Sequence, residues 1–170
     1  MTTPENSDRF EHRMEVAYEV TATPDQVWDA IATAEGISAW MVPTTLDPRV
    51  GGEVSFDFGD TQSGGVVTDY TPVRRFAYEE PWPMTDEMRE WVGAVAEPPT
   101  DEDIAAVGPI ATEFLVEAES GGSCVLRIVT SAYGRGADWE KEFFAEMVAG
   151  WKPMLDALGA RLGATTTADR

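Results

Sequence analysis

The sequence predicts an α+β protein in which a curved antiparallel sheet of about six strands packs around one long C-terminal helix. Three observations predict this fold. Apolar residues occupy alternate positions in several short segments, turn residues separate those segments, and an apolar stripe with helical spacing closes the chain. The 170 residues are expected to form a single domain, with its core in residues 14–162.

One strand and two short helices are predicted first. Residues 14–21 alternate between apolar and polar side chains, as on a strand with one buried face. Thr23 and Pro24 then begin a helix, because threonine caps helix N-termini and proline suits the first helical position. Residues 37–40 form a second short helical turn after Gly36.

Five further strands are predicted downstream, with a helical insert among them. The strands share alternating apolar residues and comprise residues 53–58, 66–71, 75–80, 112–119 and 124–131. The insert, residues 81–110, separates the fourth and fifth strands and has the spacing of two short amphipathic helices. We expect it to form a lid whose Met88, Trp91 and Val95 face a pocket mouth; the alternative is packing outside the sheet or against another subunit.

A long helix is predicted from about Asp138 to Leu162. Its apolar stripe consists of Trp139, Phe143, Met147, Trp151, Leu155, Leu158 and Leu162. Trp151 is expected in the core, and the tail beyond Leu162 is expected to fray. One helix cannot fill the concave side of a strongly bent sheet, so we expect a cavity beneath it.

The composition argues against nucleic acid and membrane lipid as binding partners. The net charge of −19, from 31 acidic and 12 basic residues, repels nucleic acid phosphates. No apolar run reaches the ~18 residues that a membrane span needs, and the polar start of the chain does not resemble a secretory signal. We therefore expect a cytoplasmic protein without membrane insertion.

Metal, cofactor and nucleophile chemistry are not expected either. His12 is the single histidine and precedes the first strand, which leaves a zinc site or a catalytic triad without an imidazole in place. Cys124 is the single cysteine and fits a small core residue. Asp69 is a weak candidate for a catalytic carboxylate, on a strand that could face the cavity. Alternation assigns other strand charges to the solvent face: Glu113, Glu117 and Arg127.

The most informative pattern is a set of mainly aromatic residues from separate elements that converge under the last helix. Many of them also serve as ordinary core. Apolar walls with a few polar tips are typical of a small-molecule site. The candidate ligand-binding residues are Trp40, Phe56, Phe58, Tyr70, Tyr78, Phe114, Phe143 and Met147.

Motifs in a particular order also carry a family resemblance. They include ATPDQVWDAI, SAWMVP, DPRVGGEVSFDF and GVVTDYTPVRRFAYE, within roughly residues 14–162. In this order they resemble the SRPBCC (START-like) superfamily, the birch-pollen-allergen fold, and its bacterial branch similar to activators of the heat-shock-protein ATPase. The resemblance implies a helix-grip fold. Residues 81–110 depart from it, because relatives usually have a short loop there.

The aromatic set and the resemblance favour binding of a small hydrophobic, aromatic or lipid-like molecule in an internal pocket, without a cofactor. Two alternatives stay open. One is a polyketide cyclase or aromatase that uses the same pocket, which would need a pKa-shifted polar cluster inside it. The other is a co-chaperone-like or stress-response protein with a docking patch for a large ATPase. A homodimer also stays open.

Overall fold

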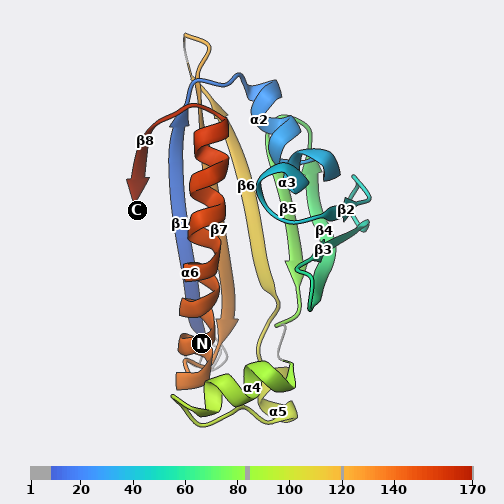
Figure 1. Ribbon diagram of the computed structural model, residues 1–170, viewed down its shortest axis with the longest axis vertical. Helices are drawn as coiled ribbons and strands as arrows, with labels where there is room; N and C mark the ends of the chain where they lie inside the picture. Colours follow the sequence, from blue (N-terminus) through green and yellow to red (C-terminus); the bar gives the residue numbers. More distant parts are fainter. Residues whose placement is uncertain (1–8, 83–84, 120, 170) are drawn as a thin grey trace, which may run out of the picture.

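The fold is built on one antiparallel sheet. The computed structural model describes residues 9–82, 85–119 and 121–169. The strand order is β2-β3-β4-β5-β6-β7-β1-β8 (Figure 1). The strands are β1 (Phe10–Val20), β2 (Thr44–Leu46), β3 (Glu53–Asp57), β4 (Gln62–Thr71), β5 (Arg75–Glu80), β6 (Ile110–Ala118), β7 (Cys124–Gly134) and β8 (Ala164–Asp169).

The helices follow from local capping signals. They are α2 (Pro24–Ile31), α3 (Ala34–Trp40), α4 (Asp86–Gly93), α5 (Asp101–Ala105) and α6 (Asp138–Arg161). Threonine hydroxyls cap α2 to α5 by accepting a backbone N–H of the first turn: those of Thr23, Thr33, Thr85 and Thr100. In the described part of the chain, none of these helices is both long and apolar enough to cross a bilayer.

The predicted fold class is confirmed, and the structure contains every predicted strand and the two helices of the insert. It also contains β2 and β8, which the sequence pattern did not indicate. β2 has 3 residues, too few for an alternating pattern. The expectation of a frayed tail is wrong, because Gly163 (φ 73°) turns the chain and β8 then pairs with β1.

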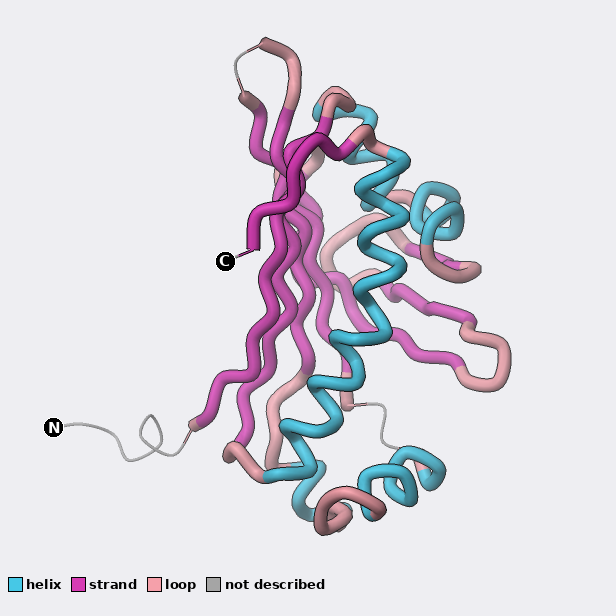
Figure 2. Tube along the Cα trace, turned by 60° about the vertical axis from the view of Figure 1, so that its left-hand side comes forward, coloured by secondary structure: helices cyan, strands magenta, loops and turns pink. Residues whose placement is uncertain are grey.

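The helices lie on one face of the sheet, its concave face. Helix α6 runs along this face, and α2 and α3 cover it beside the C-terminal half of α6 (Figures 1 and 2). Helices α4 and α5 lie beyond the strand ends, beside the N-terminal end of α6 (Figure 1). The insert therefore extends the layer of helices at one end of the molecule.

The core under the helices divides into two apolar clusters. The main cluster joins the sheet to α2, α3 and the C-terminal half of α6, and it contains Trp28, Cys124 and Trp151, all buried as predicted. The insert cluster joins the N-terminal half of α6 to the insert; its buried members are Trp82, Val92, Ile110, Ala132, Trp139, Phe143 and Phe144. Met14 and Met147 are only partly buried and pack against both clusters. The two clusters thus meet at these two methionines, and Met147 lies midway along α6.

Candidate functional site

Part of the predicted aromatic set converges in the main cluster. Phe56 stacks obliquely on Tyr78 with ring centroids 5.4 Å apart, and Trp40 meets Phe114 edge-on at 6.3 Å. The space that these four side chains enclose has no room for a water molecule. The large cavity expected at this position is therefore filled by the side chains themselves.

The other predicted ligand-binding residues lie around this centre. Tyr70 donates its hydroxyl hydrogen to the Ala32 carbonyl oxygen at 2.7 Å, and Met147 lies between the clusters. Phe143 belongs to the insert cluster. Phe58 does not join the set, since it is 45% exposed. Strand β3 ends at Asp57, so the alternation that would turn Phe58 inward stops one residue before it.

On the concave face, a row of buried hydroxyl groups crosses three strands, beginning at Tyr78 of the main cluster. Tyr78, Thr112 and Thr130 are paired across β5, β6 and β7, and each is at most 2% exposed. The two threonine hydroxyls lie 3.3 Å apart. Burial raises the pKa of Tyr78 well above its usual value, to which the charge of Glu80 also contributes. We call Tyr78, Thr112 and Thr130 the polar row.

Glu80 extends this polar surface toward the insert. It lies two residues after Tyr78 in β5, so both side chains point to the concave face. The residue is 9% exposed, and its side chain forms no hydrogen bond or ion pair with any residue in the described ranges. Burial raises the pKa of Glu80 to about 7. A carboxyl group with these properties can hold or release a proton near neutral pH.

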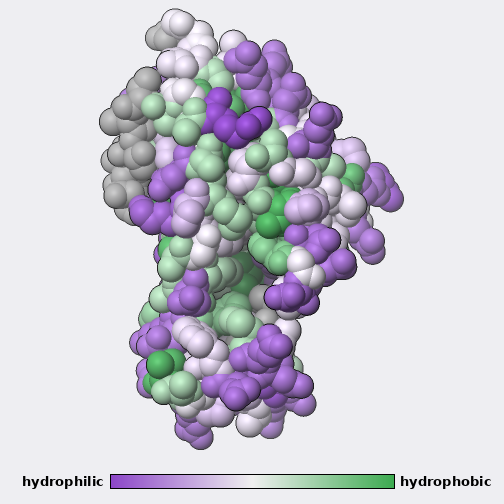
Figure 3. Space-filling view, viewed as in Figure 1, coloured by the Kyte–Doolittle hydropathy of each residue, from purple (hydrophilic) through white to green (hydrophobic). Residues whose placement is uncertain are grey.

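A groove of about 390 Å³ opens beside Glu80, between the strands and the insert. Its walls are Gly65, Val66, Glu79, Glu80, Pro81, Trp82, Ile104, Val107, Gly108 and Pro109. The Trp82 indole N–H donates to the Gly108 carbonyl oxygen at 2.7 Å, which fixes the ring. Figure 3 shows the molecule narrowing to a waist above the insert, with hydrophobic side chains at its floor. We call this space the insert groove.

The predicted lid residues divide between inside and outside. Met88 packs against the insert cluster, whereas Trp91 is 38% and Val95 59% exposed. Val92 is fully buried in the cluster instead. The amphipathic stripe of α4 is therefore rotated from the predicted one, with Met88 and Val92 inside.

Asp69, the weak catalytic candidate, lies on the opposite, outer face of the sheet. Arg75 donates to Asp69 at 2.6 Å and also pairs with Glu113. Hydrogen bonds from Thr71 and Arg75 lower the pKa of Asp69, which opposes a role in proton transfer. The irregular register between Val67 and Asp69 accompanies this placement. Arg127 lies on the same face, in ion pairs with Glu15 and Glu117, as predicted.

His12 is placed differently from the expectation. It lies within β1, is buried, and its Nε2 is 2.9 Å from Oε1 of Glu140. Glu140 also accepts hydrogen bonds from the backbone N–H groups of residues 135–137. The side chains of Phe10, Trp82 and Phe144 surround the imidazole. The pair thus fastens β1 to the start of α6.

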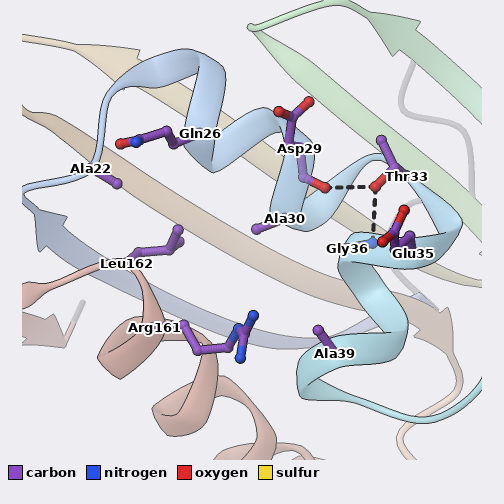
Figure 4. Close-up of a pocket in the computed structure, with 10 residues that line it drawn as sticks. All are labelled: Ala22, Gln26, Asp29, Ala30, Thr33, Glu35, Gly36, Ala39, Arg161 and Leu162. Carbon is purple, nitrogen blue, oxygen red and sulfur yellow. Dashed lines mark hydrogen bonds between the residues drawn. The ribbon is translucent and has the colours of Figure 1, made fainter.

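A second groove lies at the other end of α6. It has a volume of about 650 Å³ between α2, α3 and the last turn of α6. Figure 4 shows Arg161 reaching into it opposite the chain segment that carries Asp29 and Glu35. These charged side chains are exposed, so water solvates them. This groove therefore lacks the desolvated polar groups that distinguish the surroundings of Glu80.

The comparisons with known proteins agree with this architecture. The family model described as Activator of Hsp90 ATPase homolog 1-like protein matches residues 21–163. No match was found among curated protein sequences.

Solved structures with the same fold cover most of the chain. Protein MLL2253 from Mesorhizobium loti has a TM-score of 0.65 at 13% identity, over 88% of this chain and 95% of its own. The Aha1 dimer from Colwellia psychrerythraea has a TM-score of 0.58 at 19% identity, over 91% and 95%. DynU16, described as a putative protein in the dynemicin biosynthetic locus, has a TM-score of 0.62 at 16% identity, over 88% and 46%. Since the family model spans most of the sequence, the chain belongs to the family of Activator of Hsp90 ATPase homolog 1-like proteins.

Proposed function

We propose that the protein binds a small hydrophobic or aromatic molecule between the polar row and the middle of α6, with the insert groove as its entrance. Small-molecule sites combine apolar walls with a few polar groups that orient the ligand. Here the two apolar clusters supply the walls, and Tyr78, Thr112, Thr130 and Glu80 supply the polar groups.

The observation that carries this proposal is the boundary between the two clusters, where the residues that touch both are only partly buried. Phe144 and Trp151 are buried on α6, yet Met147, between them, is only partly buried. Met14 on β1, which packs against the same two clusters, is partly buried as well. Both are methionines, whose unbranched side chains adapt to different neighbours. Rotation of the two thioether chains would open this position and would give up the contacts that they make with both clusters.

Binding can be tested with Nile red, a neutral dye whose fluorescence increases in apolar surroundings. Met147→Trp should fill the space and weaken dye binding about tenfold or more, equivalent to ~1.4 kcal/mol. Ala149→Trp is the matched control, because residue 149 is exposed on the same helix. Equal dye binding by both variants and the wild type would place the dye elsewhere and contradict the proposed site.

A second candidate function is acid–base catalysis of a cyclisation in the same space. Glu80 favours it, since a buried carboxyl with a pKa of about 7 can act as a general acid or base. DynU16, described as a putative protein in the dynemicin biosynthetic locus, shares the fold. Incubation with aromatic polyketide precursors would test it: product formation that Glu80→Gln abolishes supports catalysis, and binding without turnover supports the binder.

We further propose that the insert regulates access to this space. Met88 and Val92 pack inward, so moving α4 away would uncover the insert cluster. Hydrogen exchange in residues 85–105 should slow when ligand is bound; unchanged, core-like protection would leave the insert as a structural element. The exposed Trp91 and Val95 are a candidate contact for a second copy, and light scattering of the protein and of Trp91→Ala tests that alternative.

A further inference from the structure

The insert groove has an uneven charge. Its wall residues include two carboxylates, Glu79 and Glu80, and no lysine, arginine or histidine. Glu79 is exposed at the rim, whereas Glu80 is nine-tenths buried. The remaining walls are apolar residues and glycines. A molecule that enters this groove therefore meets apolar surface and one desolvated acid.

Among the described residues, Glu80 has no side-chain partner of the kind that a buried carboxylate requires. Ionised carboxyl groups in apolar surroundings are normally paired with a cation or hydrogen-bonded. The described residues provide neither to Glu80. Among the other wall residues, Trp82 has a side chain that can donate a hydrogen bond, and its Nε1–H already donates to the Gly108 carbonyl oxygen. Within the described part of the chain the place of a partner is open, and a molecule in the groove can take it.

We propose that the insert groove binds a small apolar amine whose ammonium group pairs with Glu80. This inference rests on the proposed function, in which the insert groove is the entrance to the site, and it specifies the class of ligand that enters there. The apolar part of the amine lies against Trp82, Ile104 and the prolines of the groove, and the volume of about 390 Å³ suits a molecule with one aromatic ring. The net charge of −19 attracts cations to the protein and repels anions.

Three probes of equal shape separate charge from hydrophobicity: 2-phenylethylamine, 2-phenylethanol and phenylacetate. Isothermal titration with the wild-type protein should give the tightest binding for the amine, about tenfold or more weaker binding for the alcohol, and none for the acid. Glu80→Gln keeps the side-chain shape and should reduce amine affinity to that of the alcohol. Glu113→Gln, on the outer face, makes the same change in net charge and should leave amine affinity within about twofold.

Two results would overturn the proposal: alcohol binding as tight as amine binding, or unchanged amine affinity in Glu80→Gln. Because the alcohol and amine are compared on the unmodified protein, a folding defect in a variant cannot produce the first result. The Nile red experiment is independent of charge. If Nile red binds and the amine and the alcohol bind equally tightly, the proposed preference for an amine is wrong. The proposed hydrophobic site would still stand.

Discussion

Two buried glutamates in this protein have opposite surroundings. Glu140, at the start of α6, is 1% exposed and accepts hydrogen bonds from backbone N–H groups of residues 135–137, with His12 beside it at 2.9 Å. Glu80, at the end of β5, is 9% exposed and has no side-chain partner in the described part of the protein. Trp82 lines the groove beside Glu80 and also contacts His12, the partner of Glu140, so location alone does not explain the difference.

The difference separates a structural acid from a functional candidate. The fold itself explains Glu140, because its oxygens satisfy backbone donors that the helix start would otherwise leave without partners. Nothing in the fold requires an acid at position 80, where an apolar residue would avoid the desolvation cost. Unpaired, pKa-shifted groups in grooves are characteristic of binding and catalytic sites.

The largest effect is expected from removing the satisfied glutamate. Glu140→Ala should lower the free energy of unfolding by about 3–5 kcal/mol, because His12 and several backbone N–H groups would lose their acceptor inside the protein. Urea denaturation measures this loss. Glu142→Ala, at an exposed position of the same helix, should stay within about 0.5 kcal/mol of the wild type. A loss below about 1 kcal/mol in Glu140→Ala would remove the contrast between the two glutamates.

Glu80 should instead make stability fall as pH rises. Burial raises its pKa from 4.5 to about 7, so between these values the unfolded chain has released a proton that the folded protein retains. Ionisation therefore favours unfolding from about pH 4.5 upward and levels off above pH 7. Relative to Glu80→Gln, the wild type should lose roughly 2–3 kcal/mol of unfolding free energy between pH 5 and pH 8. Parallel pH profiles for the two proteins would contradict a desolvated, unpaired carboxyl group.

The outer face provides a comparison with paired acids that water still reaches. Arg75→Gln removes the partner of Asp69 and Glu113 and should cost less than about 1 kcal/mol at pH 7, since exposed ion pairs contribute little. The lowered pKa of Asp69 should rise toward its ordinary value, which carboxyl NMR titration measures. The stabilisation by Asp69 is present above its unfolded pKa and disappears as the pH falls through its lower folded pKa. An unchanged Asp69 titration would mean that Thr71, not Arg75, sets it.

The smallest effect is expected on the exposed side of α4. Trp91→Ala should change the free energy of unfolding by no more than about 0.5 kcal/mol, whereas Val92→Ala should cost roughly 1–3 kcal/mol because Val92 is fully buried. Thermal and urea denaturation of the two variants tests which side of α4 packs into the insert cluster. Reversed magnitudes would mean that Trp91 packs on the protein and that α4 is rotated.

The fold was predictable because its signals are periodic and repeated. Alternating apolar residues identified the long strands, Thr23 with Pro24 identified the start of α2, and the stripe containing Trp151 identified α6. Two strands could not be predicted from the sequence. β2 is too short for an alternating pattern, and the polar residues 164–169 resemble a loop in sequence. Phe58 was placed inside because alternation does not show where a strand ends.

The candidate site was less predictable, because polar groups acquire their roles from three-dimensional surroundings. In the segment FAYEE, Glu80 occupies the same alternate positions as Phe76 and Tyr78, whose side chains point to the concave face. This alternation was the sequence feature that indicated an inward side chain at position 80. An acid at a strand end normally faces solvent. The sequence pattern therefore did not predict that the insert would bury Glu80. His12 likewise precedes the apolar alternation, and its partner Glu140 lies 128 residues away.

The pairing of β8 with β1 also affects how separate copies of the protein behave. Strand β1 has 11 residues. Strand β8 pairs with the backbone of Val16–Val20 on the edge of β1 that β7 does not occupy. Without β8 this segment would be an open edge, and long open edges recruit strands from other molecules. At the opposite edge, β2 has 3 residues and offers little template. Strand β8 thus blocks edge-to-edge association of the sheet with other copies. Deleting the residues after Gly163 should promote aggregation and leave the polar row in place.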